Sequence, residues 1–243
     1  MNKLNYNKLG EVYILLQMDC ELKCKVCPYW GIKGACNNQL FKKKYIETDP
    51  LNFEIITKFI DSVGNYSPET ITLSGGEPLL YEKWVDLAKY INKKGIKVSL
   101  STNGLHLDKY IEEIMKWVGS IQISLGGTKD ILNKIRSADY GFDKVIENIK
   151  KINQYKKNYN QASPYIRLIY VISDLSYEKI KEFYEYFLEQ NIEIDDFYFQ
   201  HVMYTDKESL KKQKNTYKNM KNTLLWDGFL YDPSKIDTEK IIK

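Results

Sequence analysis

The most constraining feature of this chain is an alternation of short apolar runs with amphipathic helical stretches. The apolar runs are rich in β-branched residues, as strands are, and the helical stretches place apolar residues three and four positions apart. The predicted strands cover 12–17, 70–74, 96–101, 120–125, 165–172 and 194–200. The predicted helices cover 50–64, 80–93, 107–117, 142–155 and 177–190. This order indicates an α/β fold with a parallel sheet covered by helices.

The spacing of the strands favours a partial barrel. Strand starts near 71, 96 and 121, and again near 166 and 194, lie 25 to 28 residues apart, which suits repeated strand–helix units. Six such units fall short of the eight in a closed barrel, so we predict a partial (β/α)6 TIM-like barrel. An open doubly wound sheet is the competing fold. The longer interval from 121 to 166 leaves room for a substrate-facing loop.

Composition argues against a disordered, collagen-like or coiled-coil protein, and the pattern along the chain predicts how it divides into domains. The 243 residues are 43% hydrophobic and 28% charged, enough apolar material for a large core. After Gln200 the pattern fades into a lysine-rich helical stretch at 207–221. We therefore predict a barrel domain over 1–205 and a short helical or irregular C-terminal extension over 206–243.

The charge balance and hydropathy pattern argue against nucleic-acid and membrane partners. The 36 basic and 32 acidic residues are too evenly matched for a dedicated nucleic-acid-binding protein. No apolar run approaches the 18 residues of a membrane span, and the early run at 12–16 is too short for a signal peptide. We expect a cytoplasmic protein.

All four cysteines lie between Cys20 and Cys36, which in a reducing compartment indicates metal binding. Cys20, Cys24 and Cys27 have CxxxCxxC spacing directly after the first predicted strand. Because iron–sulfur clusters are usually held by four cysteines, three thiolates would leave one iron of a cubane open to another ligand. The alternative is a structural zinc site with Cys36 as fourth ligand, in a binding protein without redox chemistry.

Polar or glycine-rich motifs also follow the next three predicted strands. They are Thr72–Pro78, Ser101–Gly104 and Ser124–Gly127. The carboxyl ends of parallel strands meet at one edge, where α/β proteins bind ligands. We therefore expect these motifs and the cysteines to form one site.

At these residues the chain resembles the radical S-adenosylmethionine (SAM) superfamily, over roughly residues 10–205. The resemblance rests on the three cysteines, on Gly75-Gly76-Glu77-Pro78, on Ser101-Thr102-Asn103-Gly104, and on Ser124 with Arg136. It implies a [4Fe–4S] cluster on the cysteines and reductive cleavage of SAM to a 5′-deoxyadenosyl radical that abstracts hydrogen from a substrate. It also implies oxygen sensitivity and an external electron donor such as flavodoxin or ferredoxin.

The resemblance assigns SAM contacts that suit the chemistry of the residues. Gly75 and Gly76 lack side chains, so their carbonyls can approach the SAM ammonium, with Glu77 orienting that loop. Ser124 and Arg136 resemble the family's carboxylate clamp, because a guanidinium forms paired hydrogen bonds to a carboxylate. Arg136 is one of only two arginines in the chain.

Ser101 and Asn103 share one face of a strand end and are candidates for the ribose hydroxyls. Asn103 can instead serve a turn before Gly104. The family often has an aromatic residue before the third cysteine, where this chain has Val26. Tyr29 or Trp30 is the candidate replacement.

Other candidate residues have open roles. Cys36 is either a hydrogen donor to a substrate radical or a small buried hydrophobe. Arg167, the second arginine, lies near the start of the fifth predicted strand, while His106 and His201 follow the ends of the third and sixth. Each is a candidate for the barrel mouth or for a structural role.

The leading interpretation is a radical SAM enzyme acting on a small polar metabolite such as a sugar or nucleotide derivative. The alternatives within the family are a peptide-modifying enzyme and an activase that installs a glycyl radical on a partner. The chain has no cysteine after Cys36, so we expect no C-terminal domain with auxiliary clusters.

Overall fold

The computed structural model describes residues 9–31, 34, 36, 51–136, 138, 141–201, 204–205, 207–216 and 229–230. The strands are β1 (Glu11–Leu15), β2 (Thr70–Ser74), β3 (Lys97–Thr102), β4 (Ser120–Ser124), β5 (Tyr165–Ile172), β6 (Asp196–His201), β7 (Tyr204–Thr205) and β8 (Phe229–Leu230). The α-helices are α2 (Phe53–Gly64), α3 (Trp84–Lys93), α4 (Ile111–Trp117), α5 (Lys129–Arg136), α6 (Phe142–Asn158), α7 (Ile180–Glu189) and α8 (Lys207–Thr216). Within these ranges no helix is both long and apolar enough to cross a membrane.

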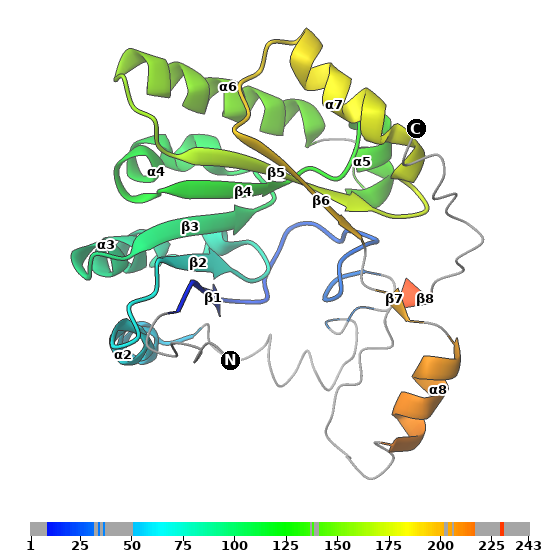
Figure 1. Cartoon of the computed structure of the whole chain (residues 1–243), viewed down its shortest axis with the longest axis horizontal. Helices are drawn as coiled ribbons and strands as arrows, with labels where there is room; N and C mark the ends of the chain where they lie inside the picture. The colour runs from blue at the N-terminus through cyan, green and yellow to red at the C-terminus, as the bar shows by residue number, and fades with distance from the viewer. Residues whose placement is uncertain are drawn as a thin grey trace, which may run out of the picture.

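Strand order distinguishes between the two competing folds. The six parallel strands of the main sheet follow one another in the order β1-β2-β3-β4-β5-β6 (Figure 1). A doubly wound sheet would reverse its order at a switch point, so the consecutive order confirms the partial barrel. In the described part of the chain β1 pairs with β2 and β6 with β5, but β1 and β6 do not pair with each other. The barrel is open between these two strands.

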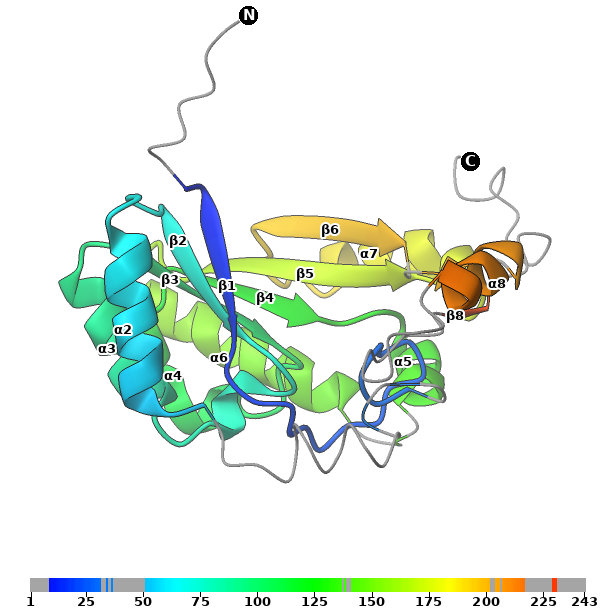
Figure 2. The same cartoon turned by 90° about the horizontal axis from the view of Figure 1, so that it is seen from below.

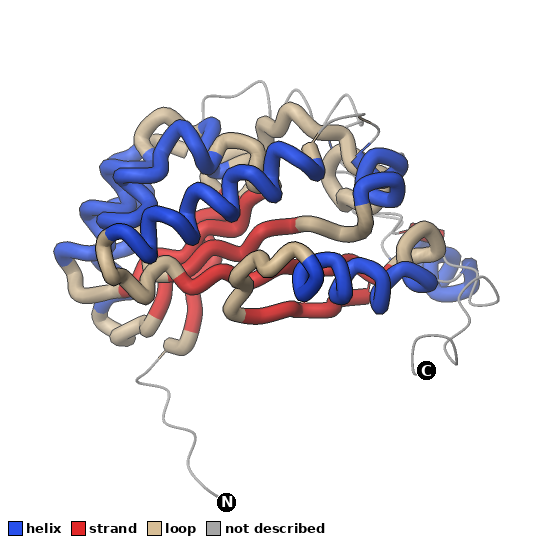
Figure 3. Tube along the Cα trace, turned by 90° about the horizontal axis from the view of Figure 1, so that it is seen from above, coloured by secondary structure: helices blue, strands red, loops and turns tan. Residues whose placement is uncertain are grey.

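The two faces of the sheet differ in polarity. Along β5, Ile166, Leu168 and Tyr170 are buried, whereas the alternate residues Tyr165 and Arg167 are at least partly exposed. The buried face packs against the helices, which Figure 3 shows layered on the strands. The sequence predicted a parallel sheet covered by helices. In the described part of the chain the helices pack on one face, and the inner, concave face carries the partly exposed residues.

Helix α5 occupies part of the interval from 121 to 166, where the sequence predicted room for a substrate-facing loop. It buries Ile131, Leu132 and Ile135, but two turns are too short for periodicity to identify a helix from sequence. Its carbonyl at Ile135 accepts a hydrogen bond from the amide of Lys25 at 2.7 Å. The loop after β1 therefore lies beside α5 (Figure 2).

Local side-chain bonds set the ends of several helices. Asn52 caps α2 by accepting from the Glu54 amide at 2.8 Å. The predicted helix over 80–93 is instead a 3-10 turn at Pro78–Leu80 followed by α3, because the Glu77 carboxylate accepts from the Leu79 amide and caps the turn.

The described C-terminal helix is α8, and the rest of the predicted stretch, 217–221, lies outside the described residues. Strand β7 pairs with β8 across the predicted domain boundary at 205/206. That boundary stays a prediction.

Candidate functional site

The segment that carries Cys20, Cys24 and Cys27 follows β1, and we call it the cysteine loop (residues 18–31). Its backbone folds back on itself, because the Cys27 amide donates to the Cys24 carbonyl at 3.0 Å. The Trp30 amide donates to Cys27 Sγ at 3.3 Å, and the Trp30 indole Nε1 donates to the Met18 carbonyl at 2.8 Å. Trp30 therefore ties the end of the loop to its beginning.

Lys23 also connects the beginning of the cysteine loop to its end. Its Nζ donates to the Cys20 carbonyl at 2.9 Å and lies 3.2 Å from the centroid of the Trp30 ring. A cation over an indole face is a favourable contact. Trp30, one of the two predicted aromatic candidates, thus contacts the Cys27 sulfur through its amide and Lys23 through its ring.

Two glycines join the cysteine loop to the end of β2. The Gly76 amide donates to the Gln17 carbonyl at 2.7 Å. A Cβ on Gly75 would lie 2.3 Å from the Gln17 carbonyl oxygen, and one on Gly76 would lie 2.1 Å from that of Asp19. Both distances are far below van der Waals contact, so this junction requires glycine. The predicted contact of these glycines with the SAM ammonium stays a prediction.

Glu77 is a buried carboxylate that links two strand ends. Its side chain is 0% exposed. It accepts from the Leu79 amide at 3.1 Å, from Thr102 Oγ1 at 2.7 Å and from the Asn103 amide at 2.9 Å. Burial raises the pKa of Glu77 to about 7, against the opposing effect of these hydrogen bonds. Glu77 thereby holds the loop after β2 against the end of β3.

Asn103 has both ends of its amide engaged. Its Oδ1 accepts from the Leu105 amide at 2.9 Å, which is the turn that the sequence offered as an alternative. Its Nδ2 donates to Glu21 Oε1 at 3.1 Å, and the same oxygen lies 3.0 Å from His106 Nε2. Glu21 therefore connects the cysteine loop to the β3 end. Glu21 was not among the site residues predicted from the sequence, where its only signal was its position next to Cys20.

Asn148 of α6 binds the backbone of the turn that follows β3. Its side chain is fully buried, and its Nδ2 donates to the carbonyls of Gly104 and Leu105 at 2.8 and 3.2 Å. Asn148 was not predicted from the sequence either, because an asparagine on an amphipathic helix resembles a surface residue. Ser101, two residues before Asn103 in β3, is half-buried and pairs in register with Gln122.

Arg136 ends α5 and points into the same strand edge. Its Nη2 donates to the carbonyls of Asn103 and Ser124 at 2.8 and 2.7 Å. The side chain is 3% exposed, and its buried Nη1 has no hydrogen-bond partner in the described part of the chain. An unpartnered buried donor is costly, so Nη1 fits an acceptor supplied by a ligand, such as the carboxylate of SAM. Ser124 itself is exposed at the strand end.

The chemistry of the cysteines fits a metal cluster. Burial raises the pKa of Cys20 to about 12 and that of Cys24 to about 11, so both are neutral thiols at neutral pH. A metal centre converts such thiols to thiolates by displacing their protons. The described residues include no set of three or more His, Cys, Asp or Glu side chains gathered closely enough for a single ion.

The residues with open roles lie in three different places. Cys36 is 1% exposed, and burial raises its pKa to about 11, as for a packed thiol; its role as a hydrogen donor stays a prediction. His201 is the exposed last residue of β6. Arg167 lies on the concave face, where its Nε donates to Asp196 Oδ2 at 2.7 Å.

Known proteins share both the sequence pattern and the fold. The cysteine-type anaerobic sulfatase-maturating enzyme of Clostridium novyi is 29% identical over 189 residues, which are 71% of this chain and 46% of that protein. Streptococcus suis SuiB, solved with its precursor peptide SuiA, has a TM-score of 0.63 at 18% identity, over 88% of this chain and 46% of SuiB. Coproporphyrinogen III oxidase (HemN) from Escherichia coli has a TM-score of 0.55 at 10% identity, over 98% of this chain and 52% of HemN.

At these identities the two structures show the fold alone. The chain spans about half the length of each of these three proteins. The family model described as the radical SAM superfamily matches residues 14–187, which include the cysteine loop, both glycine-rich strand ends and Arg136. Because this match covers most of the sequence, the chain belongs to the radical SAM superfamily.

Proposed function

We propose that the chain binds a [4Fe–4S] cluster through Cys20, Cys24 and Cys27 and uses SAM to abstract hydrogen from a small polar substrate. The observation that carries this proposal is the buried, unpartnered Nη1 of Arg136, at the same strand edge as the three cysteines. When bound, the cluster and SAM supply a 5′-deoxyadenosyl radical. The electron comes from an external donor such as flavodoxin or ferredoxin.

The residues of the chain bind and orient the cofactors. Arg136, held by two backbone carbonyls, presents Nη1 to the SAM carboxylate, and the exposed Ser124 lies beside it. Glu77 holds the Gly75–Gly76 turn in place. Because Asn103 is engaged in its turn, the half-buried Ser101 is the better candidate for the ribose.

The experiment uses anaerobically reconstituted protein. Cys24→Ala should abolish 5′-deoxyadenosine formation from SAM under dithionite. Arg136→Met should retain its iron but bind SAM at least about tenfold more weakly, as expected for the loss of a hydrogen bond to a charged group. Wild-type protein that contains no iron–sulfur cluster, or an Arg136→Met variant with full SAM affinity, would contradict the proposal.

A peptide substrate is the second candidate. It is favoured by the names of two similar proteins, the sulfatase-maturating enzyme and SuiB bound to the precursor peptide SuiA. The open side of the barrel between β1 and β6 would admit a chain.

A further inference from the structure

A polar cavity of about 320 Å³ lies at the amino ends of the strands. Its lining residues are Gly10, Glu11, Glu69, Thr70, Ser120, Gln122, Tyr165 and Arg167. Four of them are the first residues of β1, β2, β4 and β5, whereas the cysteine loop follows the last residue of β1. The volume is at the low end for small-molecule sites, so it suits a small metabolite better than a peptide chain.

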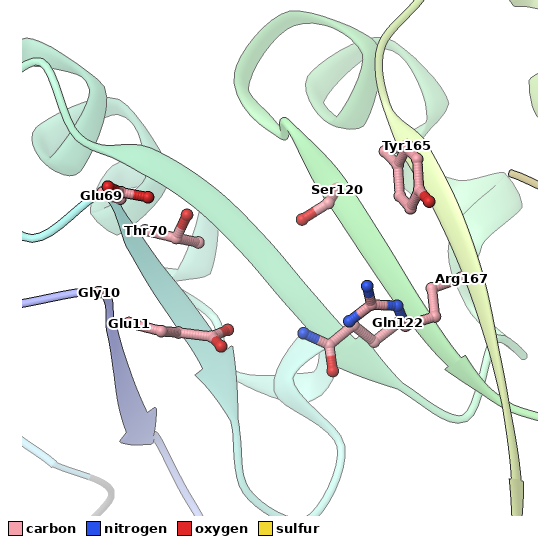
Figure 4. A pocket seen from close by; sticks show the side chains of 8 residues that line it. All are labelled: Gly10, Glu11, Glu69, Thr70, Ser120, Gln122, Tyr165 and Arg167. Carbon is pink, nitrogen blue, oxygen red and sulfur yellow. The ribbon is translucent and has the colours of Figure 1, made fainter. Parts of the chain in front are cut away.

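The charged side chains of this cavity belong to opposite walls. Figure 4 shows Glu11 on β1 and Gln122 and Arg167 on β4 and β5, with their polar ends pointing toward one another. Glu69 adds a second acidic residue on the β1–β2 side. The lining contains no aliphatic side chain. A ligand that complements it carries a positive group toward β1 and a negative group toward β5.

Arg167 is fixed in an orientation that suits a carboxylate. Its Nε donates to Asp196 Oδ2 at 2.7 Å, and the guanidinium lies 5.7 Å from the centroid of the Tyr198 ring. The two terminal nitrogens make no hydrogen bond within the described part of the chain. A guanidinium held in this way presents a planar pair of donors, the geometry that binds a carboxylate through two parallel hydrogen bonds.

The opposite wall suits an ammonium group. Glu11 accepts a hydrogen bond from Thr72 Oγ1 and also interacts with the Tyr13 hydroxyl, and these contacts orient its carboxylate. A carboxylate has about four acceptor sites, so Glu11 can still accept from an ammonium group. Gln122, whose Nε2 lies 3.4 Å from Ser99 Oγ, adds a neutral amide between the two charges. An isolated anion would be repelled by Glu11 and Glu69, and an isolated cation would face Arg167.

We propose that this cavity binds a small zwitterion of the free amino acid class, with its ammonium at Glu11 and its carboxylate at Arg167. This inference rests on the proposed function, because the bound molecule is the substrate of the radical reaction. Arg167 and Gln122 pair in register with each other and with Ser101, one residue before the end of β3. Two lining residues of the cavity therefore lie in the same row of the sheet as Ser101, a proposed contact of SAM.

The test is calorimetric titration of cluster-loaded, SAM-bound protein with each of the twenty standard L-amino acids, without reductant. At least one should bind with a Kd below about 1 mM. Its decarboxylated amine and its N-acetyl derivative should each bind at least about tenfold more weakly, because each lacks one charge.

Two variants test the contributions of Arg167 and Glu11 to binding separately. Arg167→Met should bind the amino acid at least about tenfold more weakly and no longer distinguish it from the amine, while Arg167→Lys should recover part of the affinity. Glu11→Gln should no longer distinguish the amino acid from its N-acetyl derivative. The control is Lys150→Met, which removes one positive charge from an exposed position on α6. This variant should bind the amino acid as tightly as wild type.

The inference is overturned if none of the twenty amino acids binds, or if both variants bind the best one as tightly as wild type. Formation of 5′-deoxyadenosine under dithionite is measured separately. If 5′-deoxyadenosine forms but no amino acid binds, the proposed function stands and this inference fails. If an amino acid binds but no 5′-deoxyadenosine forms, the proposed function fails and the cavity is a ligand site without a reaction.

Discussion

Glu77→Gln is expected to remove a pH dependence of folding that originates at one buried carboxyl. Burial raises the pKa of Glu77 from its ordinary value of 4.5 to about 7 in the folded chain. Between pH 4.5 and about pH 7, the Glu77 carboxyl is therefore mostly protonated in the folded state and mostly ionised in the unfolded state. The free energy of unfolding then falls as pH rises through that window, by about 2.5 kcal/mol between pH 5 and pH 8.

The variant also loses hydrogen-bond complementarity. Glutamine places an NH₂ group where one Glu77 oxygen accepts from the Asn103 amide at 2.9 Å, so two donors face each other. That conflict lowers stability by about 1–3 kcal/mol, the cost of an unsatisfied buried polar group. The assay is urea unfolding of cluster-free protein at pH 5, 6, 7 and 8, with the exposed Glu82→Gln as control. Parallel pH profiles for wild type and Glu77→Gln would refute the reasoning.

Two further predictions concern the cysteine loop. Gly76→Ala should prevent cluster incorporation, because its Cβ would lie 2.1 Å from the Asp19 carbonyl oxygen. The measurement is the iron content of the protein after reconstitution. Gly64→Ala is the control, because its added carbon has no neighbouring atom within 4 Å, and it should incorporate the cluster normally. Lys23→Met should lower the midpoint potential of the cluster, because it removes a positive charge 2.9 Å from the Cys20 carbonyl and so disfavours the more negative reduced state. A redox titration followed by electron paramagnetic resonance measures the potential, with the exposed Lys58→Met as control; an unchanged potential would contradict the argument.

Local sequence signals predicted most of the elements that build the barrel. Each predicted strand of the main sheet is present with ends shifted by no more than two residues, because β-branched runs and glycine-rich ends are local signals. Helix α5 was missed because eight residues carry too little periodicity. The polar concave face was also missed, because the strands were interpreted as nearly continuous apolar runs, which are typical of strands covered on both faces.

The sequence by itself determined the chemistry that the chain can carry: three closely spaced cysteines, glycine-rich strand ends and two arginines, at positions that identify the family. Only the tertiary structure decided which groups meet. It brought Glu21 to Asn103, Glu77 to Thr102 and Arg136 to the Ser124 carbonyl, and it placed Glu11 opposite Arg167. The physical reason is that composition and spacing are local properties of the chain. Burial, an unpartnered donor and the sign of charge across a cavity arise from contacts between residues that are distant in sequence.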